Sequence, residues 1–238
     1  MMPDDMLTVE HLTKRFRAAE TPLGGHSSMP EPPVIEDLSF TIPRGGRVTL
    51  FAPTGAGKTT LIDILTGLDR TYEGSFRLTA RNPATIFQEP RLFPHMTVEE
   101  NVILPAQIRR IPLTPAMCEK YERWLEVCGL TAYTRYFPYQ LSGGMKQKVA
   151  LMRGFVTDPD FVMMDEPFKS LDLHSKQAII RHILEVHPNI SLLFVTHALE
   201  EVPLLTQSVL LFKTNRLANY TTHDASRLDT ILMEAIHG

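Results

Sequence analysis

Short apolar runs alternate with longer segments of helical periodicity over much of the chain. Strands are expected at Arg47–Phe51, Phe161–Met164 and Ser191–Val195, and helices at Thr59–Leu68, Met145–Val156 and Ser175–His187. Strands that are separated by helices of this length pair in parallel through right-handed crossovers. The pattern therefore predicts an α/β fold with a parallel sheet.

Shorter strand segments lie on both sides of this region, and a helical segment interrupts it. These strands are Leu7–Val9, Val34–Phe40, Ser75–Leu78, Thr85–Phe87, Val209–Phe212 and Arg216–Tyr220. Further helices are expected at Thr97–Gln107, where Thr97 and Glu100 form a capping-box pattern, at Ala116–Cys128 and at Ser226–His237. We therefore expect one domain over residues 1–238, with a core and β subdomain at 1–88 and 141–238 and an inserted helical subdomain at 89–140.

The segment between the first two strands differs in composition from the rest of the chain. Residues 17–33 are rich in Pro, Gly and Ser. This composition is typical of a flexible loop, and a docking site for a partner is the alternative interpretation.

Composition narrows the class of protein. A length of 238 residues can form one large domain or two small ones. A net charge of −3 gives no reason to expect nucleic acid as a partner. No apolar run approaches the ~20 residues that span a bilayer, so a membrane-spanning partner must be another polypeptide. Residues 1–5 lack the pattern of an export signal. Cys118 and Cys128 lack partners at metal-ligand spacing and are interpreted as reduced thiols of a cytosolic protein.

A glycine-rich segment follows the first parallel strand and opens a helix. It comprises Thr54, Gly55, Ala56, Gly57, Lys58, Thr59 and Thr60. Backbone N–H groups of such a loop bind nucleotide phosphates, the Lys58 ammonium adds a positive charge, and the Thr59 hydroxyl is a ligand for Mg²⁺. The usual pattern G-x-x-x-x-G-K-[ST] begins with glycine, whereas this chain has Ala52 there. Alanine is small enough for close packing, although a positive φ would strain it.

Two carboxylates follow the apolar strand Phe161–Met164. Because catalytic groups gather where buried parallel strands end, Asp165 is expected to hold Mg²⁺. Glu166 is expected to orient the water that attacks a γ-phosphate, or to accept its proton. An acidic helix cap is the alternative for such a pair considered alone.

A second glycine turn, Leu141–Met145, precedes the helix expected at Met145–Val156. Two adjacent glycines let backbone N–H groups approach an anion, and the start of a helix carries a positive partial charge. Ser142, Gly143, Gly144 and Met145 therefore form a second candidate phosphate-binding surface.

These motifs, in this order, resemble those of the ATP-binding cassette (ABC) ATPases, from Leu7 to about Phe212. The resemblance implies the P-loop NTPase fold of the ABC type, with an antiparallel β subdomain and an inserted α-helical subdomain. It implies that His197 is the switch histidine at the γ-phosphate and that Gln88 contacts Mg²⁺ and the attacking water. It also implies that Phe16 stacks on adenine and that Asp172 belongs to the D-loop Ser-Leu-Asp. Considered alone, a histidine at a strand end such as His197 is more often an ordinary capping or surface residue. For Phe16, a core phenylalanine is the alternative interpretation.

The resemblance further implies a mechanism that needs two chains. Two cassettes close head to tail around two ATP molecules with Mg²⁺, and each ATP lies between the P-loop of one chain and Ser142–Gly144 of the other. The implied partners are a second copy of this chain, transmembrane subunits contacted through the helical subdomain, and indirectly a substrate-binding protein. Nucleic acid is not among them. The implied location is cytoplasmic, on the inner face of the cell membrane.

Details of the motifs favour one group within this family. Met145 after Ser-Gly-Gly and the run Glu166–Phe168 most resemble the ATPases of nitrate, sulfonate and taurine importers. The alternatives are a soluble ABC ATPase outside transport, a cassette of another importer or exporter class, and a cassette that binds ATP without hydrolysing it. The presence of Lys58, Asp165 and His197 argues against the last.

Overall fold

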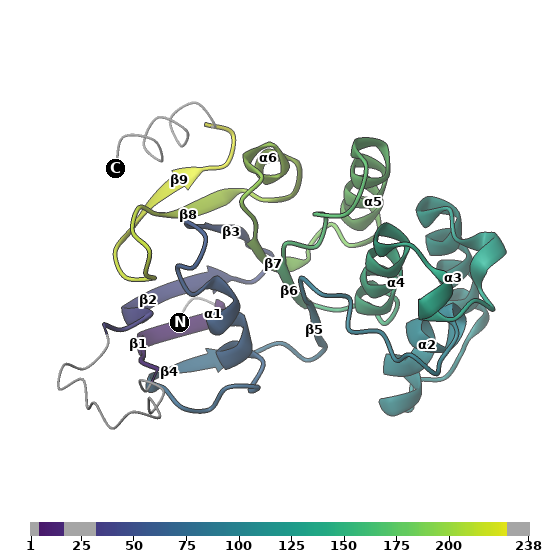
Figure 1. The fold of residues 1–238 in the computed structure, drawn as a ribbon, viewed down its shortest axis with the longest axis horizontal. Coiled ribbons are helices and arrows are strands. Elements are labelled where there is room, and N and C mark those ends of the chain that lie inside the picture. The colour runs from purple at the N-terminus through teal and green to yellow at the C-terminus, as the bar shows by residue number, and fades with distance from the viewer. Residues whose placement is uncertain (1–4, 17–31, 228–238) are drawn as a thin grey trace, which may run out of the picture.

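The computed structural model describes residues 5–16 and 32–227, which form two sheets and a group of helices (Figure 1). The strands are β1 (Asp5–Lys14), β2 (Ile35–Pro43), β3 (Arg47–Phe51), β4 (Glu73–Leu78), β5 (Pro83–Ile86), β6 (Phe161–Asp165), β7 (Ser191–Val195), β8 (Ser208–Phe212) and β9 (Tyr220–Asp224). The helices are α1 (Lys58–Leu65), α2 (Val98–Ile108), α3 (Pro115–Cys128), α4 (Gly143–Phe155), α5 (Leu173–Val186) and α6 (Val202–Leu205). Short 3₁₀ turns lie at Thr131–Tyr133, Pro138–Gln140 and Leu199–Glu201.

The larger sheet has the strand order β5-β6-β7-β3-β8-β9. Its first five strands are parallel, and β9 pairs antiparallel with β8. Every residue of β6 and of β7 is buried, because side chains cover both faces of the sheet. The parallel α/β arrangement predicted from the apolar runs is therefore confirmed.

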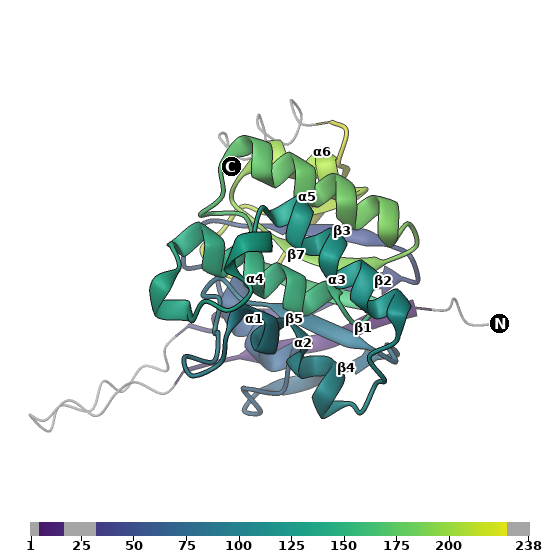
Figure 2. The same ribbon diagram turned by 90° about the vertical axis from the view of Figure 1, so that its right-hand side faces the viewer.

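This sheet separates two hydrophobic cores. Phe161 and Met163 of β6 point into a core that they share with α1 and the smaller sheet. Val162 and Met164, the alternate residues, point into a core that they share with α2, α3, α4 and α5. Figure 2 shows these four helices in front of the sheets. One strand thus joins the two halves of the molecule, and its carboxyl end lies between them.

The smaller sheet is antiparallel, with the order β2-β1-β4. Its buried side chains, among them Leu7, Val9 and Phe40, pack with those of α1. The expected antiparallel β part of an ABC-type fold is confirmed, and it holds α1 against the larger sheet.

Helices α2 and α3 follow β5 and lie at one end of the molecule (Figure 1). The Thr97 hydroxyl and the Glu100 carboxylate form the predicted capping box at the start of α2. Trp124 of α3 is fully buried and stacks on Phe155 of α4, with the ring centroids 5.7 Å apart. This contact fixes the inserted helices to the core. The division of the chain into subdomains stays a prediction.

The structure corrects two sequence predictions. The strand expected at Arg216–Tyr220 is wrong: β9 runs from Tyr220 to Asp224, and Leu217 instead bridges Ile35 of β2. The helix expected from Met145 begins at Gly143, because the Ser142 side chain caps it by accepting a hydrogen bond from the Met145 N–H. Most of the helix predicted at residues 226–237 and of the loop predicted at 17–33 lies outside the described residues.

Candidate functional site

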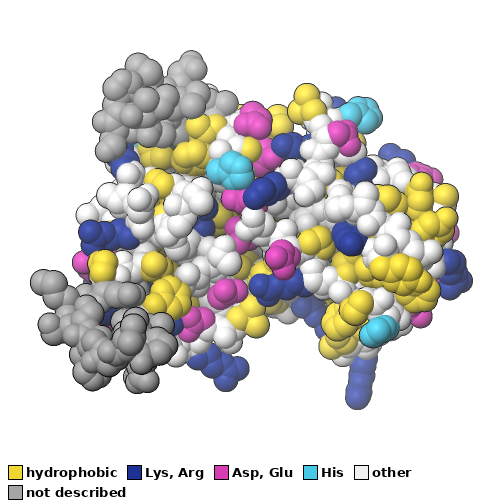
Figure 3. Space-filling view, viewed as in Figure 1, with side chains coloured by type: hydrophobic (Ala, Val, Ile, Leu, Met, Phe, Trp, Pro, Cys, Tyr) yellow, Lys and Arg dark blue, Asp and Glu magenta, His cyan; other side chains and the backbone are white. Residues whose placement is uncertain are grey.

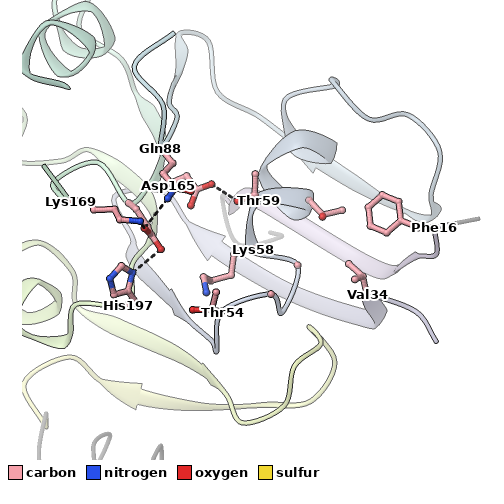
Figure 4. Close-up of a pocket in the computed structure, with 13 residues that line it drawn as sticks. Phe16, Val34, Thr54, Lys58, Thr59, Gln88, Asp165, Lys169 and His197 are labelled. Carbon is pink, nitrogen blue, oxygen red and sulfur yellow. Dashed lines mark hydrogen bonds and ion pairs between the residues drawn. The ribbon is translucent and has the colours of Figure 1, made fainter. Parts of the chain in front are cut away.

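A cavity of about 560 Å³ lies at the carboxyl ends of the parallel strands. Figure 4 shows the residues that line it, which come from segments far apart in the sequence. They are Phe16, Val34, Thr54, Gly55, Gly57, Lys58, Thr59, Thr60, Gln88, Asp165, Glu166, Lys169 and His197. In the space-filling view, acidic, basic and histidine side chains gather in the middle of this face, between the sheets and the helices (Figure 3). The cavity therefore joins most of the residues that the sequence singled out.

The glycine-rich loop has the backbone conformation that brings N–H groups close to an anion. Gly55 has a φ of 83° and Gly57 a φ of 96°, a region that side-chain-bearing residues rarely adopt. A Cβ on Gly57 would lie 2.8 Å from Cγ1 of Val34. Ala52 is buried and is not among the residues with positive φ, so alanine is unstrained there. The loop thus tolerates the missing first glycine of the usual pattern.

Lys58 begins α1 at the wall of the cavity and is only 8% exposed. Its ammonium donates hydrogen bonds to the carbonyl oxygens of Ala52, at 2.8 Å, and Pro53, at 2.9 Å. Burial lowers the pKa of Lys58, and the nearby carboxylates of Glu166 and Asp165 partly oppose that shift. A positive charge is therefore held at the base of the glycine-rich loop by two carbonyls of the same loop.

Asp165 ends β6 and is 2% exposed. Its Oδ2 atom accepts a hydrogen bond of 2.8 Å from the Thr59 hydroxyl. Burial raises the pKa of Asp165, and the Thr59 hydrogen bond partly offsets that shift. A carboxylate, a hydroxyl and the Gln88 amide thus line one cavity, and such oxygen donors suit Mg²⁺. The residues present therefore fit the predicted ion.

Glu166 has a left-handed backbone, with a φ of 46°, which is unusual for a side-chain-bearing residue and recurs at functional sites. Its Oε1 atom lies 2.8 Å from Nδ1 of His197. Its Oε2 atom accepts a hydrogen bond of 3.3 Å from the Gln88 amide. Two side chains that the sequence placed on separate strand ends, Gln88 and His197, therefore meet at the Glu166 carboxylate, which follows a third strand.

Lys169 and Val34 line the cavity although the sequence analysis assigned them no role. The Lys169 ammonium lies 3.5 Å from Oε2 of Glu166, and the side chain is 55% exposed. The sequence contained one signal for Lys169, which is its spacing of three residues from Glu166. Val34 had no such signal, because its place depends on how β2 packs against the glycine-rich loop.

Phe16 lies at the end of the cavity opposite His197 (Figure 4). It is 50% exposed, so the alternative interpretation as a core phenylalanine is wrong. The Lys14 ammonium lies 5.1 Å from the centroid of its ring. An exposed aromatic face at the wall of a cavity can stack on a planar ring.

The second glycine motif lies outside this cavity. Ser142 and Gly143 are exposed at the start of α4, and Met145 is half-buried. A Cβ on Gly144 would lie 2.8 Å from the carbonyl oxygen of Ser170, so this glycine permits a close approach of two loops. Asp172 caps α5 by accepting a hydrogen bond of 2.9 Å from the Ser175 N–H. The predicted residues therefore divide into a set around the cavity and a set on a separate surface.

Comparison with known proteins agrees with this arrangement. The sequence profile of the family described as ABC transporter matches residues 35–169. The aliphatic sulfonates import ATP-binding protein SsuB of Bacillus cereus is 34% identical over 191 residues, which cover 75% of this chain and 73% of the relative. SsuB 2 of Paraburkholderia xenovorans is 37% identical over 216 residues, which cover 85% and 81%.

Solved structures give the same result. An ATP-binding subunit of an ABC transporter superposes with a TM-score of 0.79 at 26% identity, over 97% of this chain and 99% of that one. A dimeric, post-hydrolysis ATP-binding cassette bound to ADP and Pi has a TM-score of 0.76 at 21% identity, over 92% and 99%. From this likeness in sequence and fold, the chain belongs to the ABC transporter family and is one of its ATP-hydrolysing cassettes.

Proposed function

We propose that this chain drives the import of a small organic anion of the sulfonate class by hydrolysing ATP as a head-to-tail dimer on separate transmembrane subunits. The observation that carries the catalytic part is the meeting of Lys58, Asp165 and Glu166, with Gln88 and His197, at one cavity. The substrate class rests on the SsuB relatives, whose name says that they import aliphatic sulfonates.

The cavity suits one ATP along its length. Phe16 would stack on adenine at one end, and the backbone N–H groups of Gly55–Lys58 would bind the β- and γ-phosphates. The Lys58 ammonium would exchange its hydrogen bonds to the carbonyls of Ala52 and Pro53 for contacts with the phosphates, because the phosphates carry a full negative charge. Thr54 and Thr60 line the same wall.

Glu166 is the proposed general base. Its carboxylate would orient the attacking water and accept its proton, while His197 contacts the γ-phosphate. The present partners of Glu166 fix both of its oxygens and thus its direction. Thr59, Asp165 and Gln88 would hold Mg²⁺, which neutralises charge on the phosphates. The chemistry consists of positioning and charge neutralisation.

The separate surface formed by Ser142, Gly143 and Gly144 is the proposed contact with the ATP of the second copy. Its exposure and its place at the start of a helix of 13 residues suit a phosphate that another chain presents. Met145 and Asp172 would border that contact. One cassette thus contains two incomplete halves of a site, and closure of the dimer would complete both.

Helices α2 and α3 are the proposed contact with the transmembrane subunits. No helix in the described part of the chain is long and apolar enough to cross a membrane. Hydrophobic side chains gather over these helices and the adjoining turns (Figure 3), and those that are large and exposed include Phe93, Ile108, Leu113, Tyr136 and Tyr139. A chain at the inner face of the membrane, linked indirectly to a substrate-binding protein, would use this surface.

The substrate class is tested by transport. The cassette is copurified with its membrane subunits, reconstituted in vesicles with the binding protein, and assayed with a short alkanesulfonate and with a polyamine. ATP-dependent uptake of the sulfonate alone supports the proposal. Uptake of the polyamine alone would overturn it and would indicate a polyamine importer. The spermidine/putrescine import ATP-binding protein PotA of Nitrosomonas eutropha is 33% identical over 204 residues, which cover 80% of this chain and 56% of that protein.

A further inference from the structure

Arg153, in the last turn of α4, binds the segment that follows Gln88. Its Nη2 atom donates a hydrogen bond of 2.7 Å to the carbonyl oxygen of Pro90, and its Nη1 atom donates one of 3.0 Å to that of Arg91. One guanidinium thus holds two consecutive carbonyls, two and three residues after Gln88. Charge-assisted hydrogen bonds from the planar guanidinium fork fix direction as well as distance.

The arginine has no carboxylate partner among the ion pairs found in residues 5–16 and 32–227. The residue is half-buried, and burial lowers the pKa of Arg153. A guanidinium removed from water is costly unless its N–H groups are hydrogen-bonded. The two carbonyls satisfy that need, so the conformation of residues 90–91 and the burial of Arg153 depend on each other.

Two further contacts place α4 against this segment. Gly154 lies so close to β5 that a Cβ there would be 2.9 Å from Cγ1 of Ile86, two residues before Gln88. Arg91 has a φ of 45°, and its guanidinium lies 3.7 Å from the ring centroid of Phe87. The residues on both sides of Gln88 are therefore fixed, one side by packing on α4 and the other by Arg153.

We propose that Arg153 is a positioning residue, which holds the Gln88 amide where it meets Glu166. The proposal rests on the catalytic role that we propose for Gln88. The same helix begins with the exposed Ser142 surface. Any displacement of α4 when that surface binds the second copy's ATP is therefore transmitted through Arg153 to the Gln88 segment of the same chain.

A double-mutant cycle tests this role. Arg153→Ala is made in the wild-type chain and in Gln88→Ala, with ATPase rates, ATP affinity and melting temperature measured for each. In the wild-type chain, Arg153→Ala lowers kcat at least ~10-fold, the order expected for losing charge-assisted hydrogen bonds, and leaves the Kd for ATP within about 2-fold. In Gln88→Ala the same change produces no further loss, because its target is gone.

Arg109 provides a matched control. Its Nη2 atom donates a hydrogen bond of 2.9 Å to the carbonyl oxygen of Pro83, at the start of β5 and away from Gln88. Arg109→Ala leaves kcat within about 2-fold if position relative to Gln88 is what matters. If α4 does not fold in the Arg153→Ala variant, the cycle is repeated with Arg153→Lys. The single lysine nitrogen should then support only part of the wild-type rate.

The outcomes separate this inference from the proposed function. Equal losses from the Arg153 change in both backgrounds, or an equal loss from Arg109→Ala, would overturn the positioning role while leaving Gln88 catalytic. An unchanged kcat in Gln88→Ala itself would instead remove Gln88 from the proposed mechanism, and the role of Arg153 with it.

Discussion

Nδ1 of His197 lies 2.8 Å from Oε1 of Glu166, although the two residues are separated by 31 positions in the sequence. They meet because β6 and β7 are parallel neighbours, with Asp165 paired to Val195, so that both side chains emerge just past the carboxyl edge. The Glu166 N–H also donates a hydrogen bond of 2.8 Å to the carbonyl of Val195. The topology of the sheet thus brings these two side chains together.

Replacing His197 by alanine removes this contact. We expect kcat for ATP hydrolysis to fall ~100-fold or more, because Glu166 loses a partner and the γ-phosphate loses a contact. The Kd for ATP should change little, since the Lys58 loop is intact. A rate assay with equilibrium binding measures both, and an unchanged kcat would remove His197 from the mechanism.

Lys58→Ala should abolish the thermal stabilisation of the protein by ATP. ATP stabilises the wild-type chain by an amount that rises with the logarithm of its concentration relative to the Kd, and the phosphate contacts provide most of the affinity. The melting temperature without nucleotide should not fall sharply, because Lys58 is a buried cation with a lowered pKa whose removal costs only two carbonyl hydrogen bonds. A full ATP-dependent shift in the variant would refute the phosphate-loop assignment.

Ser142→Arg should stop hydrolysis while leaving ATP binding to the single chain intact. The bulky cation would lie on the exposed start of α4, outside the cavity, and block the approach of a second copy. Thr222→Arg, at an exposed position of β9, is the control and should retain its rate. Cooperative turnover by the Ser142 variant would contradict a role for this surface in the partner's site.

The two cysteines should react differently with a disulfide reagent. Cys118 is exposed on α3, whereas burial raises the pKa of the Cys128 thiol to about 12, so its reactive thiolate is scarce at neutral pH. One thiol should therefore react rapidly in the native protein and two after unfolding. Rapid reaction of both thiols in the native state would show that α3 does not pack as described.

Much of the fold could be predicted from the sequence, because apolar runs and turn residues are local signals. The capping box at Thr97 and the fully apolar strands β6 and β7 appear in the structure as expected. The loop around Lys58 and the carboxylates after β6 were predictable for a related reason: parallel strands bring whatever follows their carboxyl ends to one edge. Phe16, Gln88 and His197 were instead predicted from the resemblance to ABC ATPases.

Other features depended on contacts that no local pattern encodes. Leu217 bridges β2 instead of starting a strand, and Lys169 reaches Glu166 through the turn after β6. No local sequence pattern indicates the close approach of Gly144 to Ser170 either. Arg153 donates hydrogen bonds to the carbonyls of Arg91 and Pro90, which lie 62 and 63 positions away in the sequence. Only the packing of α4 on β5 brings these residues together.

The most direct test of the two-chain mechanism is the mass of the Glu166→Gln variant in saturating Mg-ATP, measured by light scattering. The variant keeps the shape of the side chain but loses its basicity, so ATP should stay bound and hold two copies together. We predict twice the mass of one chain with ATP, the mass of one chain without it, and a return to one chain when Ser142→Arg is added. A mass of one chain while ATP is bound would contradict the account.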